Sequence, residues 1–231
     1  MVNIALIAAA GKGCRMNAGL SKMLMRLDEK PILTHTLEKF EEAQCIDKIV
    51  LVINPTDRKV IEQIILSNNR FNKVTKIITG GNTRQDSVYN GLQAIDNDQE
   101  DIVLIHDGAR PFITEQMMKA TIQQAQIFDG AIIAVPVLDT IKKVQSEQLI
   151  DRTIDRGRLW QAQTPQTFRL SCIKALHRKA SKEGFVASDD AIIVEHYGGQ
   201  VKIIEGSRNN LKITDPFDMA VAKVLMRKGL W

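Results

Sequence analysis

The sequence opens with residues 1–22, MVNIALIAAAGKGCRMNAGLSK, in which an apolar run passes directly into a glycine-rich loop. Residues 2–9 form the apolar run, which is typical of a strand that is buried on both faces. The loop that follows has glycine at positions 11 and 13. Because glycine lacks a Cβ, backbone N–H groups in such a loop can approach an anion closely. This stretch therefore predicts a buried first strand that ends at a phosphate-binding loop.

Two basic residues, Arg15 and Lys22, accompany the glycines. Arginine grips phosphate oxygens in a forked geometry, and lysine adds a compact point charge. Two better-known phosphate loops are excluded. A Walker loop needs Ser or Thr after Gly-Lys, where this chain has Gly13, and a dinucleotide fingerprint needs a third glycine, where it has Met16. Taken alone, the loop also fits an ordinary tight turn between a strand and a helix.

The rest of the chain alternates strand-like and helix-like segments. Strands are predicted at 48–54, 74–79, 101–107, 131–137 and 201–205, and helices from Pro31, from Pro55, at 84–95, after Thr114, at 171–183 and at 215–227. This order predicts an α/β protein with a mostly parallel twisted sheet and helices on both faces. Residues 138–163 break the pattern and predict a protruding β-arm. We expect residues 1–231 to form a single domain with this extension.

Composition excludes several classes of protein. No apolar run is long enough to span a bilayer, and the first strand begins without a basic leader, so we expect a cytoplasmic protein with no membrane partner. The three cysteines and four histidines lack metal-ligand spacing, which argues against a disulfide frame or a zinc site. The 31 basic and 27 acidic residues are well mixed, and the sequence has no concentrated basic stripe. We therefore expect no nucleic-acid partner.

Ligands in such sheets collect at the carboxyl ends of strands. After the third strand, residues 80–88 read GGNTRQDSV, where Ser87 and the amides that open a helix could bind a base or a ribose. After the fourth, residues 106–111 read HDGARP. In a phosphate-rich site Asp107 is a natural Mg²⁺ ligand, and Arg110 could pair with it or face the ligand. The ordinary alternative for residues 80–88 is a helix N-terminus with suitable capping residues, and for residues 106–111 it is an Asp–Arg pair that stabilises a turn.

Two further clusters follow the fifth strand. Thr140 leads into the arm, whose far side carries Arg156 and Thr164. Arg156 and Thr164 could bind a second phosphate. Near the C-terminus, Lys212 in the segment NLKIT comes just before a capped helix and next to a strand end. A solvated arm and a surface lysine are the ordinary interpretations of these residues.

Together these clusters resemble the 2-C-methyl-D-erythritol 4-phosphate cytidylyltransferase family. The matching segments occur in family order and cover nearly the whole chain: AAGKGCRM with Lys22, GGNTRQDSV, DGARPF, DT at 139–140, DRGRLWQAQTPQTF, SDD at 188–190, and NLKIT. The resemblance implies a Rossmann-like nucleotidyltransferase that converts CTP and methylerythritol phosphate, a sugar-alcohol phosphate, into the CDP-alcohol and pyrophosphate. That reaction belongs to the non-mevalonate route to isoprenoid precursors.

The resemblance also implies roles for individual residues. It makes Arg15, Lys22 and Lys212 catalytic, and it places Asp107 near Mg²⁺. It makes Thr140, Arg156 and Thr164 substrate-binding, and it implies a homodimer with interlocking arms in which Arg156 and Thr164 serve the partner's site. The nucleotide-binding residues it implies are Ala9, Ala10, Gly11, Gly13, Gly80, Gly81, Asp86, Ser87, Asp107, Gly108, Ala109 and Arg110. One departure is Ser21, because the family usually has proline there and proline would fix φ.

Two alternative functions stay open at this point. A cytidylyltransferase for another polyol phosphate, such as ribitol 5-phosphate, would share fold, nucleotide and mechanism. The segments DGAR and DRGRLW look closer to the methylerythritol family. A nucleotide-binding domain without turnover is the second alternative. The presence of Arg15, Lys22, Asp107 and Lys212 together argues against it, since a pure binder has no need for every charge.

Overall fold

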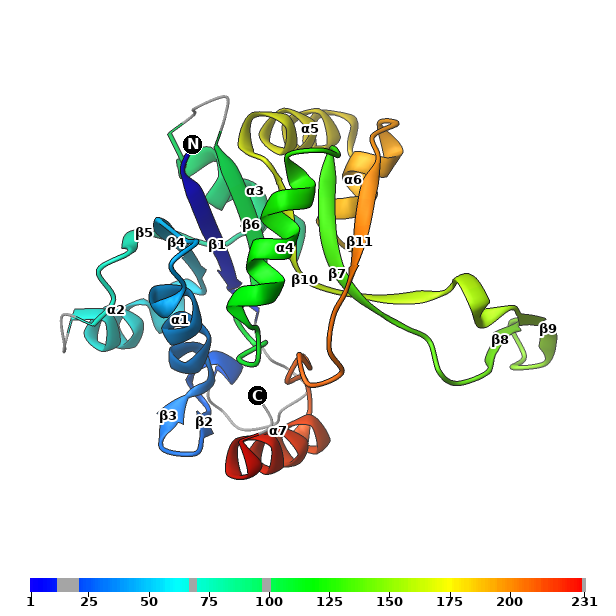
Figure 1. Ribbon diagram of the computed structural model, residues 1–231, viewed down its shortest axis with the longest axis horizontal. Coiled ribbons are helices and arrows are strands. Elements are labelled where there is room, and N and C mark those ends of the chain that lie inside the picture. Colours follow the sequence, from blue (N-terminus) through cyan, green and yellow to red (C-terminus); the bar gives the residue numbers. More distant parts are fainter. Residues whose placement is uncertain (12–20, 67–69, 97–100, 230–231) are drawn as a thin grey trace.

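The computed structural model describes residues 1–11, 21–66, 70–96 and 101–229. Gly13 and Arg15, two residues of the predicted phosphate loop, lie outside them. Within the described residues, seven strands form a central sheet in the order β11-β7-β10-β6-β1-β4-β5 (Figure 1). Their bounds are β1 Asn3–Ala9, β4 Lys48–Ile53, β5 Val74–Thr79, β6 Ile102–Asp107, β7 Gly130–Pro136, β10 Trp160–Arg169 and β11 Val201–Glu205.

The pairings in this sheet are parallel except for those of β10, which runs antiparallel to both β6 and β7. The prediction of a mostly parallel α/β sheet is therefore confirmed. The strands predicted at 74–79 and 201–205 have the same bounds in the structure.

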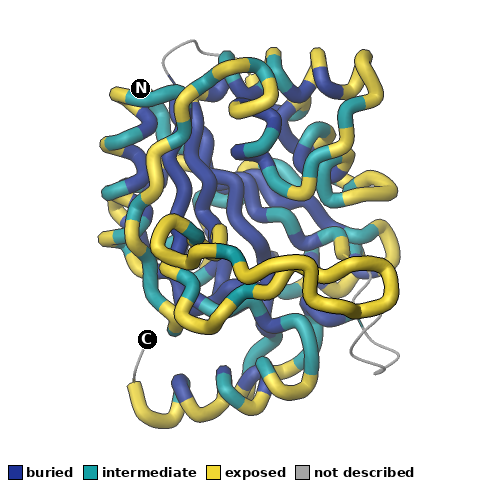
Figure 2. The backbone as a smooth tube through the Cα atoms, turned by 90° about the vertical axis from the view of Figure 1, so that its right-hand side faces the viewer, coloured by how far each residue is buried: buried dark blue, intermediate teal, exposed yellow. Residues whose placement is uncertain are grey.

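Helices cover both faces of the sheet. On one face lie α1 (Ile32–Glu42), α2 (Arg58–Leu66) and α4 (Glu115–Ala125), and on the other lie α3 (Arg84–Ala94), α5 (Leu170–Glu183) and α6 (Asp190–His196). Alternation along β1 explains this arrangement, because Ile7 packs into the first core while Ile4 and Leu6 pack into the second. Each such side chain stabilises the fold by about 1.5–3 kcal/mol. Figure 2 shows the strands buried between the two helical layers.

A third apolar cluster joins the C-terminal helix α7 (Pro216–Lys228) to the segment after the predicted phosphate loop. Leu27 belongs to a short hairpin, β2 (Arg26–Leu27) with β3 (Lys30–Pro31), and it is fully buried in the same cluster as Ile213 and Met219. Asp215 caps α7 in a capping box with Asp218. This packing brings residues near the two ends of the chain to the same edge of the sheet.

The arm leaves the body between β7 and β10. It consists of the antiparallel strands β8 (Ile141–Val144) and β9 (Ile150–Ile154), and Figure 1 shows it projecting well beyond the sheet. The pair occupies the stretch at 138–163 that the sequence pattern set apart, although Trp160 already belongs to β10.

Among the described strands and α-helices, the hairpin β2–β3, the strand β10 and the short helix α6 were not predicted from the sequence. The strand β10 is unusual because its buried side chains are largely polar. Gln163, Thr164, Gln166 and Thr167 are all at most 7% exposed. Among the described helices, none is both long and apolar enough to cross a membrane.

Candidate active site

A ligand pocket lies at the carboxyl ends of β1 and β6. From β1 the chain builds β4 and β5 on one side and then returns to form β6 on the other. The loops that leave β1 and β6 therefore diverge, and a crevice opens between them. Such a crevice is general in α/β sheets at the point where the strand order changes direction. The pocket here has a volume of about 510 Å³. That volume lies within the range of small-molecule sites.

One wall of the pocket depends on a close backbone approach at Gly80. A Cβ at Gly80 would lie 2.2 Å from Cβ of Ala10 and 2.8 Å from Oγ of Ser87. The Ser87 hydroxyl accepts a hydrogen bond from the Gly81 amide at 3.0 Å and donates one to the Thr83 carbonyl at 2.8 Å. Ser87 thus shapes the loop that follows β5, and only glycine at position 80 lets this loop contact the end of β1.

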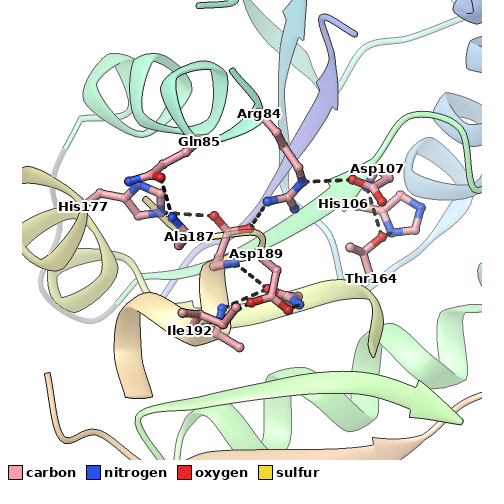
Figure 3. A network of polar contacts seen from close by, with 12 residues as sticks. Arg84, Gln85, His106, Asp107, Thr164, His177, Ala187, Asp189 and Ile192 are labelled. Atoms are coloured by element: carbon pink, nitrogen blue, oxygen red, sulfur yellow. Dashed lines mark hydrogen bonds and ion pairs between the residues drawn. The ribbon is translucent and has the colours of Figure 1, made fainter. Parts of the chain in front are cut away.

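Asp107 is the negative centre of the opposite wall. Its Oδ2 lies 2.9 Å from Lys212 Nζ and 3.5 Å from Arg110 Nε. Its Oδ1 lies 3.3 Å from Arg84 Nε, a contact drawn in Figure 3. Burial alone would raise the pKa of Asp107. The charges of Arg84, Lys212 and Arg110 outweigh it and hold that pKa well below its usual range. Asp107 is therefore ionised, with three cations arranged around it.

A fully buried histidine fixes the loop that carries Asp107. His106 Nδ1 lies 3.0 Å from the Thr164 hydroxyl, and its Nε2 lies 3.0 Å from the Arg110 carbonyl. Burial lowers the pKa of His106 to about 4, so the ring is neutral at pH 7. Its Nε2–H then donates to the Arg110 carbonyl, and Nδ1 accepts from Thr164. The Thr164 oxygen in turn accepts from the Asp107 amide at 3.1 Å.

Lys212 reaches this wall because its segment is hydrogen-bonded to the loop after β6. The Ile213 amide donates to the Ala109 carbonyl at 2.9 Å. The Arg110 Nη1 donates to the carbonyl of Asn210, which is fully buried, at 2.8 Å. A segment more than 100 residues away in sequence from β6 is thereby fixed against it.

Lys22 lies at the start of a 3-10 helix, η2 (Lys22–Leu24), and is only 8% exposed. The preceding Ser21 has φ −56° and ψ 134°. This φ lies within the range that proline fixes, about −65 ± 15°. Ser21 therefore adopts the backbone conformation that the family's usual proline would impose.

Comparison with known proteins identifies the family. The model of the family described as 2-C-methyl-D-erythritol 4-phosphate cytidylyltransferase matches residues 3–228. The chain belongs to this family. A relative of that name from Geobacillus kaustophilus is 46% identical over 222 residues, with 96% of each chain covered. Another, from Caldanaerobacter subterraneus subsp. tengcongensis, is 42% identical, with 97% of this chain and 98% of the relative covered.

Solved structures agree with this assignment. The 4-diphosphocytidyl-2C-methyl-D-erythritol synthase of Anaerococcus prevotii superposes with a TM-score of 0.85 at 30% identity, covering 98% of this chain and 96% of that one. The 2-C-methyl-D-erythritol 4-phosphate cytidylyltransferase of Thermus thermophilus superposes with a TM-score of 0.79 at 29% identity, covering 96% and 98%. The chain therefore has the nucleotidyltransferase fold that its sequence predicted.

The structure brings most of the predicted nucleotide residues to one pocket. Those on its lining are Ala10, Gly11, Gly80, Gly81, Ser87, Asp107 and Ala109. The lining also includes Lys22 and Lys212, which were predicted as catalytic residues. Ala9, Gly108 and Arg110 are buried and do not line it. Asp86 is exposed, and its carboxylate accepts from the Thr83 amide in the capping box of α3.

The predicted substrate residues are not brought together within one chain. Thr140 and Arg156 are exposed on the arm, where Arg156 Nη1 donates to the Leu138 carbonyl. Thr164 is 4% exposed, and its hydroxyl is already bonded to His106 and Asp107. In this structure Thr164 supports the loop of Asp107, which differs from the predicted direct grip on a phosphate.

Sequence reasoning missed Arg84. It is the first residue of α3, lines the pocket and contacts Asp107. A cation is unfavourable at a helix N-terminus, where the helix dipole is positive. An arginine at that position, three residues after Gly81 in the segment GGNTR, is a signal that could have identified it.

Proposed function

We propose that this chain transfers a cytidylyl group from CTP to 2-C-methyl-D-erythritol 4-phosphate and releases pyrophosphate. Family membership supports the two substrates. The observation that carries the chemistry is the pocket between the loops that leave β1 and β6. Lys22, Lys212 and Arg84 line this pocket, and Lys212 and Arg84 contact its one ionised carboxylate, Asp107. A cationic, partly buried crevice of this kind suits a triphosphate.

The reaction needs charge and position rather than a nucleophilic side chain. A phosphate oxygen of the alcohol attacks the α-phosphorus of CTP in line, that P–O bond forms, and the bond to pyrophosphate breaks. Negative charge grows on the equatorial and leaving oxygens, so fixed cations stabilise the transition state. We assign this role to Lys22 and Lys212, and to Arg15 from the family resemblance. The attacking phosphate is already ionised and needs no general base.

Mg²⁺ is part of the proposal. Asp107 is the only carboxylate among the described residues that line the pocket, and the described residues contain no cluster of three or more His, Cys, Asp or Glu side chains. Mg²⁺ is commonly bound by one or two carboxylates plus phosphate oxygens and water. This donor set therefore fits an ion held mainly by the nucleotide, with Asp107 as the protein ligand. Bound there, the ion would neutralise charge on the triphosphate.

We further propose that the active form is a cytoplasmic homodimer. The arm exposes apolar side chains, with Leu149 59% and Ile150 63% exposed in the described part of the chain. Exposed apolar groups gathered on one projection are typical of an interface. The arm also carries Thr140 and Arg156, which would then reach the methylerythritol phosphate in the partner's pocket.

One assay tests the proposed function. Pyrophosphate release is measured with each of the four nucleoside triphosphates, using methylerythritol phosphate or ribitol 5-phosphate as acceptor. We expect release only with CTP and methylerythritol phosphate. Pyrophosphate release with ribitol 5-phosphate instead would show that the chain is a cytidylyltransferase for that polyol phosphate. No release with any pair of substrates would favour a nucleotide-binding domain without turnover.

A further inference from the structure

Arg84 is held by two carboxylates from different parts of the fold. Its Nε lies 3.3 Å from Asp107 Oδ1, and its Nη1 lies 2.8 Å from Asp190 Oδ2 (Figure 3). Asp107 lies at the end of β6, whereas Asp190 is the first residue of α6. The Arg84 side chain is 27% exposed and lines the nucleotide pocket, while the Asp190 side chain is only 1% exposed.

Asp190 is itself fixed from behind. Its Oδ1 lies 3.1 Å from His177 Nε2, and its backbone amide donates to Gln166 Oε1 at 2.9 Å. Burial by itself raises the pKa of Asp190, but the charge of Arg84 and the hydrogen bond from His177 lower it below the usual value. An ionised Asp190 can only accept, so His177 Nε2 carries the proton and donates it to the carboxylate.

The second carboxylate matters because Asp107 is already crowded. Lys212 and Arg110 both approach its Oδ2. An arginine that depended on Asp107 alone would compete with Lys212 for the same group, or its long side chain would turn into solvent. Holding a free arginine in one rotamer costs side-chain entropy. The ion pair with Asp190 fixes the guanidinium in the free protein, so that this entropy is not lost again when a ligand binds.

We propose that Asp190 is a positioning residue for nucleotide binding: its buried ion pair holds Arg84 at the pocket as a preorganised cation for the phosphates of CTP. The inference deepens the proposed function and rests on it for the identity of the nucleotide. Asp190 does not line the pocket and acts through Arg84.

The substitution Asp190→Asn tests this role, since it keeps the shape of the side chain and removes its charge. We expect the Kd for CTP, measured by titration calorimetry, to rise on the order of tenfold. The KM for CTP should rise accordingly, with a smaller change in kcat. The matched control is Glu195→Gln, which removes a carboxylate charge at an exposed position of the same helix, α6. This control should bind CTP like the wild type.

A double-mutant cycle separates positioning from a general effect on the fold. In an Arg84→Ala background, Asp190→Asn should weaken CTP binding no further, because the residue through which it acts is gone. Additive losses in the cycle would overturn the proposal. So would an Asp190→Asn protein that binds CTP as tightly as the wild type.

Arg84→Lys provides a second variant if Asp190→Asn folds poorly. Lysine keeps the charge but lacks the fork that contacts both carboxylates, so CTP binding should weaken here too. Unchanged binding would count against the proposal. Failure of the transfer reaction remains distinguishable, because these titrations need no turnover. Wild-type protein that binds CTP but releases no pyrophosphate overturns only the proposed reaction, whereas wild-type protein that does not bind CTP overturns both.

Discussion

Lys212 is the most exposed of the three cations around Asp107, with 38% of its side chain accessible. It is therefore the one best placed to move onto a phosphate when the nucleotide binds. We predict that Lys212→Ala, and likewise Lys22→Ala, lowers kcat by about a hundredfold or more while the KM for CTP changes much less, because a transition-state contact is lost. Steady-state kinetics give both parameters. Lys223→Ala, at an exposed position of α7, is the control. Near-normal kcat in both pocket variants would show that the assignment is wrong.

Ser21 makes a second residue-scale prediction. Because its φ of −56° suits proline, Ser21→Pro should raise the free energy of unfolding by about 0.5 kcal/mol, through a less flexible unfolded chain, and should leave activity intact. Ser21→Ala removes the hydroxyl without restricting φ and should give no such gain. Denaturant unfolding of the three proteins measures the difference. A Ser21→Pro protein less stable than Ser21→Ala would mean that the loop does not accept the family's proline.

His106 gives a pH dependence with a defined sign. In the unfolded chain its pKa is near 6.5, whereas burial lowers it to about 4 in the folded protein. Between these values the unfolded state binds the extra proton, so this group makes stability fall as pH drops from 6.5 towards 4. The expected loss is about 3 kcal/mol across the window. Asp107 and Asp190 do not dominate there, since their contributions are lost mainly below 3.8, the unperturbed pKa.

The measurement compares wild type with His106→Gln, which is polar and does not titrate. Urea unfolding at several pH values between 4 and 7 should show a shallower dependence for the variant, because the remaining histidines are common to both proteins. Equal slopes would assign the pH dependence to other groups.

At the scale of elements, sequence patterns predicted those whose stability comes from apolar burial. The strands β1 and β4 are largely apolar. The helices α3 and α4 begin directly after Thr83 and Thr114, whose side chains cap them. The strand β10 escaped because polar side chains are buried along it and hydrogen-bonded across the fold, as in Thr167 with Thr121. No local pattern encodes such partners. The ion pair of Arg84 with Asp190 could not be predicted for the same reason, because the two residues lie more than 100 positions apart in the sequence.

Gln166 shows what the polar side chains of β10 do. Its Oε1 accepts from the amides of Asp190 and Ala191 at 2.9 and 3.0 Å, so it supplies the acceptor for the first turn of α6. Gln166→Leu would leave these buried N–H groups without that acceptor, and we expect a loss of about 3 kcal/mol in unfolding free energy. Gln161→Leu, at an exposed position of the same strand, should cost little. Similar losses in the two variants would refute this role for Gln166.

At the scale of the whole molecule, the pocket and the arm lie in different parts of the chain, yet the proposed reaction needs both. The pocket holds cations for a triphosphate, while Thr140 and Arg156 lie in the segment that forms the arm, next to β8 and β9. If a partner's arm completes each pocket, a monomer should bind CTP normally and fail at transfer. In the dimer, Arg156→Ala should raise the KM for methylerythritol phosphate and leave CTP affinity nearly unchanged.

Leu149→Glu combined with Ile150→Glu puts two charges on the exposed apolar side chains of the arm, where burying an unpaired charge at an interface is costly. We expect sedimentation velocity to show a dimer for the wild type and a monomer for this variant. Its Kd for CTP should be unchanged and its pyrophosphate release reduced at least tenfold at equal concentration. Val186→Glu introduces a charge at a position that is 85% exposed and remote from the arm in sequence, and it should remain an active dimer. A wild-type monomer with full activity would contradict the shared site, because one chain would then have to hold both substrates by itself.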